Sequence, residues 1–189
     1  KFIAAFYASA NYQVINLGLK RKDHEIVEYW QDYIIEAKHC GYKFLSWNVW
    51  HQGQVGSVGK LTAMFPIEHE FIFVFGKQAK DLNPTVPNKG AGEKHNDVKD
   101  RQADGTTAKK KEIQIREKRE IGTVLELNCV LARNDLDILH SASFPKEFPF
   151  AYIEAMTNQD ELVCEPFCGS GTTLIACEQL NRKCRAIEI

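Results

Sequence analysis

Two glycines and two acids near the carboxyl end of the chain have types and spacing that suit nucleoside binding. Gly169 and Gly171 follow the acid Glu165, and Glu188 lies 17 residues beyond Gly171. Glycines let the backbone turn tightly and let a ligand approach, because they have no Cβ. An acid about 20 residues beyond such glycines, at the tip of the next strand, can accept hydrogen bonds from two ribose hydroxyls.

The elements that must position these residues are a strand, a glycine turn, a helix and a second strand. Residues 162–164 form a short apolar run typical of a buried parallel strand, and Pro166 ends it. Residues 172–181 have apolar side chains at helical spacing, and the free N–H groups at the start of this helix favour an anionic group such as a carboxylate. The second strand is expected at Ala186 and Ile187, with Glu188 at its end.

Other nucleotide-binding classes share this layout but differ in detail. A phosphate-binding loop requires a lysine after the second glycine, and none follows Gly171. A dinucleotide fingerprint requires a third glycine at position 174, where this chain has Leu174. A nucleotide-dependent oxidoreductase is therefore the weakest of the alternatives.

Residues 165–173 read Glu-Pro-Phe-Cys-Gly-Ser-Gly-Thr-Thr. This string resembles motif I of the amino-group (N6-adenine/N4-cytosine) DNA methyltransferases, commonly Asp-Pro-Phe-x-Gly-Ser-Gly-Thr-Thr, with glutamate in place of the usual aspartate. The resemblance implies S-adenosylmethionine as the cofactor. It implies that the loop wraps the methionine portion and that Glu188 holds the ribose. The cofactor-binding residues it implies here are Glu165, Phe167, Cys168, Gly169, Ser170, Gly171, Thr172 and Glu188.

A second stretch, residues 140–145, reads His-Ser-Ala-Ser-Phe-Pro. It resembles motif X of the same family, often His-Pro-Ala-x-Phe-Pro, which lies just before motif I. The resemblance implies that Ser143, Phe144 and Pro145 complete the cofactor wall. The same residues also suit the start of a helix with Pro149 in its first turn, and the two interpretations are compatible. The helix itself is predicted over residues 150–157.

The chain has 189 residues, a length that suits one domain or one domain with an insertion. Its 44% of hydrophobic residues is enough to form a buried core. The resemblance implies an α/β, Rossmann-like three-layer methyltransferase fold with a mostly parallel sheet. The pattern before residue 77 predicts the end of a helix (1–10), a central strand (12–19), a helix (24–39) capped by Asp23 and ended by Gly41, a strand (42–50) and a strand near a sheet edge (68–75). Residues 51–59 are glycine-rich, either a loop near the target base or the methyl donor, or a flexible surface connection.

Charge is divided between an acidic body and a basic insert. Residues 77–120 hold 12 Lys/Arg and 8 Asp/Glu, whereas the remainder holds 12 Lys/Arg and 17 Asp/Glu. The insert has too few apolar residues to form a core of its own, and ordered chain is expected to resume at 122–131. It is either a DNA-contacting target-recognition region or a solvated loop, and the resemblance favours DNA contact by Lys109, Lys110, Lys111, Arg116, Lys118 and Arg119. Residues 1–76 and 121–189 would then form the methyltransferase core.

The six cysteines include no C-x-x-C pair, which favours reduced core thiols over a zinc site and predicts a cytoplasmic protein. No apolar run approaches the roughly 20 residues that span a bilayer, and no metal is expected. The resemblance implies a prokaryotic or phage-encoded protein, double-stranded DNA as partner and, by analogy alone, a homodimer.

The order of the motifs matches the β-type arrangement of the family from just after the catalytic motif onward. That motif, Asp/Asn/Ser-Pro-Pro followed by an aromatic residue, has no counterpart, because none of the six prolines is followed by another. We expect the catalytic strand to precede Lys1, so no catalytic residue is assigned. The expected activity is methyl transfer to the exocyclic nitrogen of a flipped base, with adenine N6 ahead of cytosine N4. The alternative is an inactive nucleic-acid-binding module on the same fold.

Overall fold

The computed structural model describes residues 9–53, 65–96, 106, 112–128 and 144–188 of the protein. The predicted helix at residues 1–10 and most of the glycine-rich loop therefore lie outside the described residues. Ser143 and Lys109 to Lys111 lie outside them as well. Among the described helices, none has the length and hydropathy needed to cross a bilayer.

The main sheet contains β1 (Tyr12–Leu17), β4 (Lys43–His51), β5 (His69–Gly76) and β10 (Val124–Glu126), in the order β1-β5-β4-β10. Strand β5 pairs antiparallel with both β1 and β4, and β10 pairs parallel with β4. Strands β1, β4 and β10 therefore run in one direction and β5 runs against them. Three of these four strands agree with the predicted parallel arrangement.

The positions of two strands differ from the sequence predictions. Strand β5, predicted near a sheet edge, is interior, and β1, predicted to be central, pairs only with β5 among the described strands. Ile72, Phe73 and Phe75 in β5 are fully buried, whereas Val14 in β1 is 37% exposed. The prediction failed because polar residues at the start of β5, such as Glu70, lie at the rim of the sheet.

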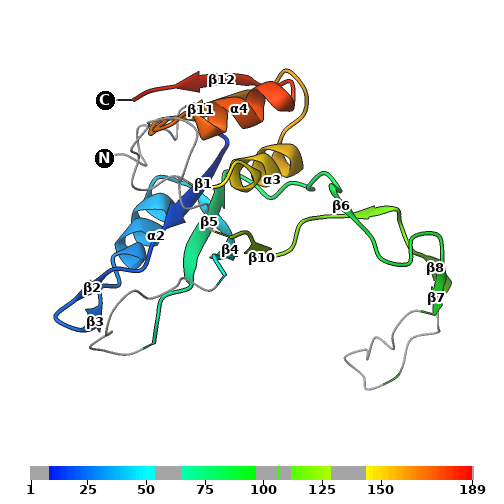
Figure 1. The fold of residues 1–189 in the computed structure, drawn as a ribbon, viewed down its shortest axis with the longest axis horizontal. Helices are drawn as coiled ribbons and strands as arrows, with labels where there is room; N and C mark the ends of the chain where they lie inside the picture. The colour runs from blue at the N-terminus through cyan, green and yellow to red at the C-terminus, as the bar shows by residue number, and fades with distance from the viewer. Residues whose placement is uncertain (1–8, 54–64, 97–105, 107–111, 129–143, 189) are drawn as a thin grey trace.

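The alternation of side chains along β5 creates a three-layer arrangement. Ile72 and Val74 pack with helix α3 (Glu147–Met156) on one face, through residues such as Tyr152. Phe73 and Phe75 pack with helix α2 (Trp30–His39) on the other face. Because successive strand residues point to opposite faces, the two helices cover opposite sides of the sheet (Figure 1).

Helix α2 begins later than predicted, and the prediction of Asp23 as its N-cap was wrong. Asp23 and His24 have φ of 52° and 69° and form the turn between β2 (Arg21–Lys22) and β3 (Glu25–Ile26), which pair antiparallel. Two consecutive residues with positive φ suit a two-residue hairpin turn, not a helix start. Gly41, with φ of 92°, follows the helix as predicted.

Residues 162–188 form a second unit, named here the C-terminal unit, built from β11 (Leu162–Glu165), α4 (Thr172–Gln179) and β12 (Lys183–Ala186). The two strands pair parallel, as expected for a strand–helix–strand crossover. Strand β12 starts before the predicted Ala186, and α3 starts at Glu147, before the predicted residue 150. Helix α3 contacts the unit through Ile153, which packs against Ala176 and Cys177 of α4.

The basic insert forms an extended two-stranded ribbon. Strand β6 (Val86–Pro87) pairs with β9 (Lys118–Arg119), and β7 (Lys94–Asn96) pairs with β8 (Glu112–Gln114). Figure 1 shows these four strands reaching away from the sheet and helices. The described part of the insert therefore has paired backbone but contributes little to the buried clusters.

Candidate functional site

The glycine loop, residues 166–171, connects β11 to α4 and is held at both strand ends. The Cys168 N–H donates to the carbonyl of Ile187 at 2.9 Å, and the Ile187 N–H donates to the carbonyl of Glu165 at 2.9 Å. Gly169 and Gly171 have φ of 51° and 83°, in the left-handed region that favours glycine. The glycines are thus required by the backbone conformation, as the sequence predicted.

Both oxygens of the Glu165 carboxylate accept hydrogen bonds from the loop and helix that follow it. The Phe167 N–H donates to Oε1 and the Thr173 hydroxyl donates to Oε2, each at 2.9 Å. Glu165 therefore ties the end of β11 to the first turn of α4. Sequence reasoning missed Thr173 as a partner, although it completes the Gly-Ser-Gly-Thr-Thr string and is buried.

Glu188 lies against the glycine loop. The Gly169 N–H donates to Glu188 Oε2 at 2.6 Å. The spacing between the glycines and the acid thus brings the two together, and the predicted role of Glu188 at a ribose stays a prediction. Among the described residues, Glu188 Oε1 has no hydrogen-bond partner, so one acceptor oxygen remains for a ligand.

The surface of the glycine loop is open. Among the described residues, a Cβ added at Gly169 would meet no atom within 4 Å, and one at Gly171 would meet only Leu174 Cδ1 at 3.7 Å. The Phe167 side chain is 70% exposed. Ser170 and Thr172 place their hydroxyls 3.1 Å apart on this exposed surface. A ligand can therefore reach the backbone of both glycines.

The glycine loop lies between two acids, which favour a cation, and the start of a helix, which favours an anion. Partial burial raises the pKa of the Cys168 thiol, and the charges of Glu165 and Glu188 raise it further, which shows negative potential at this point. The first turn of α4, which begins at Thr172, presents unpaired N–H groups that favour an anion. The site therefore suits a ligand that carries both charges. The described residues contain no group of three His, Cys, Asp or Glu side chains that could hold a metal.

The motif X residues within the described part lie at the start of α3. Phe144 stacks on Phe148 with ring centroids 5.1 Å apart, and Pro145 is buried. Phe148 in turn packs on Trp50 of β4. The described contacts of Phe144 are thus with the core beneath α3, and its predicted role at the cofactor stays a prediction.

Of the predicted DNA-contacting residues, Arg116, Lys118 and Arg119 are described. The Arg116 guanidinium donates two hydrogen bonds to the Glu120 carboxylate, at 3.1 and 3.0 Å. Lys118 and Arg119 are consecutive residues of β9, so their side chains point to opposite faces of the ribbon. The structure therefore does not gather the three cations on one face.

Comparison with known proteins gives one family and a set of similar structures. A family model described as DNA methylase, for N6 and N4 methyltransferases, matches residues 6–189. The structure is similar to that of M1.HpyAVI in complex with S-adenosylmethionine, with a TM-score of 0.59 and 20% identity over 99% of this chain and 74% of that one. It is also similar to PvuII DNA methyltransferase, cytosine-N4-specific, with a TM-score of 0.63 and 16% identity over 94% of this chain and 59% of that one.

No curated protein matches the sequence significantly. The chain spans less than two thirds of the length of the PvuII enzyme. At these identities the structural similarities establish the fold, and they confirm the predicted Rossmann-like methyltransferase architecture. The family match covers nearly the whole chain, and the protein therefore belongs to the N6/N4 DNA methylase family.

Proposed function

We propose that this chain supplies the cofactor-binding and DNA-contacting parts of a DNA methyltransferase. The enzyme would transfer a methyl group from S-adenosylmethionine to the exocyclic amino group of a base flipped out of DNA, with adenine N6 as the expected target. Residues 1–76 and 121–189 would form the methyltransferase core, and residues 77–120 the target-recognition region. The observation that carries the proposal is the Glu188 carboxylate at an open glycine loop.

The described residues fit a nucleoside that carries an amino acid. Glu188, held by the Gly169 N–H, would use its remaining oxygen to accept hydrogen bonds from ribose hydroxyls. The N–H groups at the start of α4 would bind a carboxylate, and the negative potential from Glu165 and Glu188 would favour ammonium and sulfonium groups. S-adenosylmethionine, when bound, supplies the methyl group on its sulfonium.

Glu165 would act by positioning. Because its two oxygens already accept from the Phe167 N–H and the Thr173 hydroxyl, its role would be to hold the loop in the conformation that a ligand meets. Preorganisation of this kind lowers the entropic cost of binding.

The ribbon would contact the phosphate backbone of DNA. The insert carries an excess of four basic residues, whereas the rest of the chain carries an excess of five acidic residues. Lys118 and Arg119 are exposed at the paired β6–β9 segment. An extended basic ribbon on an acidic body directs DNA to the ribbon, because phosphate contacts by Lys and Arg supply most nonspecific affinity.

The cofactor assignment can be tested by calorimetry of S-adenosylmethionine binding to the full-length protein. We expect Glu188→Ala to weaken binding by about tenfold or more, since it removes charge-assisted hydrogen bonds to the ribose. The matched control is Glu178→Ala, which removes an exposed acid of α4 in the same unit. Equal affinity of the Glu188→Ala variant and the unaltered protein would refute the ribose assignment.

The reaction can be tested with labelled cofactor, plasmid DNA and the full-length protein, followed by nucleoside analysis. Label in N6-methyl-2′-deoxyadenosine is the expected result, and label in N4-methyl-2′-deoxycytidine would correct the base. Cofactor and DNA binding without methyl transfer would instead support an inactive nucleic-acid-binding module.

A further inference from the structure

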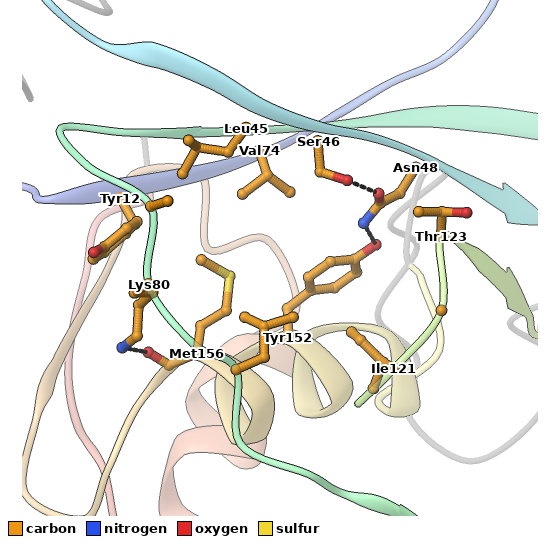
Figure 2. A pocket seen from close by; sticks show the side chains of 13 residues that line it. Tyr12, Leu45, Ser46, Asn48, Val74, Lys80, Ile121, Thr123, Tyr152 and Met156 are labelled. Atoms are coloured by element: carbon orange, nitrogen blue, oxygen red, sulfur yellow. Dashed lines mark hydrogen bonds between the residues drawn. The ribbon is translucent and has the colours of Figure 1, made fainter. Parts of the chain in front are cut away.

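A cavity of about 300 Å³ lies between the main sheet and α3 (Figure 2). Its walls include residues on both sides of the ribbon, Lys80 where the chain leaves the sheet and Ile121 where it returns. None of its lining residues belongs to the glycine loop or to Glu188. It is therefore separate from the proposed cofactor site.

A chain of three polar side chains lines one wall of the cavity. The Ser46 hydroxyl bonds to Asn48 Oδ1, and Asn48 Nδ2 donates to the Tyr152 hydroxyl at 3.0 Å. Asn48 and Tyr152 are only 6% and 5% exposed. Figure 2 shows the two hydrogen bonds running from the sheet to the helix along one wall.

This chain of hydrogen bonds leaves one hydroxyl proton unused. If Asn48 Oδ1 faces Ser46, the Tyr152 hydroxyl accepts from the amide and its own proton has no acceptor among the described residues. If the Asn48 amide is rotated by 180°, Nδ2 donates to the Ser46 hydroxyl and Oδ1 accepts from the Tyr152 hydroxyl. The Ser46 hydroxyl proton then has no acceptor instead. Burial raises the pKa of Tyr152, although the hydrogen bond from Asn48 opposes this, so the phenol remains protonated at neutral pH. Either way, this wall of the cavity presents one O–H donor.

Leu45, Val74 and Met156 line the middle of the cavity, and the polar residue Thr123 lies beside Asn48 (Figure 2). Lys80, an exposed residue, donates from Nζ to the carbonyl of Met156 at 2.7 Å and lies 5.3 Å from the centre of the Tyr12 ring. The ammonium group has two further protons. The cavity thus has an O–H donor on one wall, an apolar middle and a cation where the exposed Lys80 lines it.

We propose that this cavity binds a small aromatic carboxylate that carries a hydrogen-bond acceptor at the far end of its ring. The carboxylate meets Lys80, the ring fills the space between Leu45, Val74 and Met156, and the acceptor takes the unused hydroxyl proton. A volume of about 300 Å³ lies at the lower end of the range for small-molecule pockets and suits a ligand with a single ring. Because the walls join both ends of the ribbon, a bound ligand would also brace the base of the ribbon.

Met156 lines the cavity. Labelling the methionine methyl groups with ¹³C in the full-length protein therefore places a reporter inside the cavity, and its signal is the one that Met156→Leu removes. The probes are 4-acetylbenzoate, which has the acceptor, and 4-ethylbenzoate, which has the same carbon skeleton without it. We expect saturable shifts of the Met156 methyl and about fivefold tighter binding of 4-acetylbenzoate than of 4-ethylbenzoate.

Lys80→Gln tests the cation that lines the cavity, because glutamine keeps an N–H donor for the Met156 carbonyl but removes the charge. We expect about threefold weaker binding of 4-acetylbenzoate and unchanged binding of its uncharged amide, 4-acetylbenzamide. Absence of a saturable Met156 shift would overturn the proposal. Equal affinity for the two carboxylates, or equal affinity of Lys80→Gln and the unaltered protein for 4-acetylbenzoate, would overturn it as well.

Discussion

The C-terminal unit and the ribbon show two ways in which the same chain uses polar residues. In the C-terminal unit, Glu165 and Arg182 are enclosed by hydrogen bonds to neighbouring turns and helices, and α4 buries Cys177 against α3. In the ribbon, charged side chains such as Arg116 are exposed and pair with near neighbours. The first region is organised before any ligand arrives, whereas the second presents charge for a partner to organise.

Substitution of one arginine in each region should give the largest difference in the free energy of unfolding. Arg182 donates to the Thr157 hydroxyl at 3.0 Å, to the Thr157 carbonyl at 2.7 Å and to the Leu180 carbonyl, so it joins the turns that follow α3 and α4. We expect Arg182→Ala to lower the free energy of unfolding by about 2–4 kcal/mol, because several charged hydrogen bonds are lost. The measurement is urea denaturation.

Arg116→Ala is the matched control, since among the described residues its guanidinium pairs only with Glu120 on the surface. We expect it to change stability by less than about 0.5 kcal/mol. Similar effects of the two substitutions would show that the ribbon is as integrated as the C-terminal unit.

Two glycines with nearly equal φ angles, one in each region, allow the rigidity of the two backbones to be compared. Gly171 in the glycine loop has φ of 83° and Gly92 in the ribbon has φ of 85°. An added Cβ would make only an ordinary contact at Gly171 and none at Gly92, so alanine introduces the same conformational strain at both. We expect Gly171→Ala to cost about 1–2 kcal/mol of global stability. Gly92→Ala should leave the melting temperature unchanged, because the ribbon can open locally.

Calorimetry separates the two glycines further. Gly171→Ala should weaken S-adenosylmethionine binding and Gly92→Ala should not, since only the first alters the glycine loop. An unchanged melting temperature of the Gly171→Ala variant would contradict the view that this loop is held rigidly at both strand ends.

The sequence predicted the contacts that depend on short spacing. The approach of Glu188 to Gly169 follows from one strand–loop–helix–strand unit, whose geometry is set locally. The two left-handed glycines were predictable for the same reason. The Thr173 hydrogen bond is equally local, and the Thr-Thr pair was a signal for it.

Features set by long-range packing were not predictable. Which strand is interior depends on pairings such as Val14 with Val74, far apart in the sequence, and the residue pattern of a single strand does not reveal them. Asp23 suits either a helix cap or a tight turn, and the choice between them is made by the pairing of Arg21 with Ile26. The link from Asn48 to Tyr152 spans the sheet and α3, so only the folded chain brings these side chains together.

The buried thiol of Cys177 predicts how stability changes at alkaline pH. Burial is the largest of the causes that together raise its pKa to about 12, and the neighbouring Cys184 is the next, so the folded protein retains a proton that an unfolded thiol loses above about pH 9. The unfolded state then binds fewer protons, and stability falls as pH rises from about 9 to 12, by up to about 1.4 kcal/mol per unit. Cys177→Ala should flatten this slope in urea denaturation, whereas Cys164→Ala, at an exposed thiol, should leave it unchanged.

The smallest expected effect concerns the charge that the ribbon offers to DNA. Glu120 holds the Arg116 guanidinium by two hydrogen bonds, so this arginine would be only partly available to phosphate. Glu120→Gln removes the competing negative charge, and we expect nonspecific affinity for duplex DNA to rise about twofold and the salt dependence to steepen. The measurement is fluorescence anisotropy over a series of salt concentrations. The control is Lys118→Ala, which should lower both affinity and salt dependence, since Lys118 has no ion pair within the described residues. Equal salt dependence of DNA binding by the unaltered protein, Glu120→Gln and Lys118→Ala would show that the ribbon does not contact DNA.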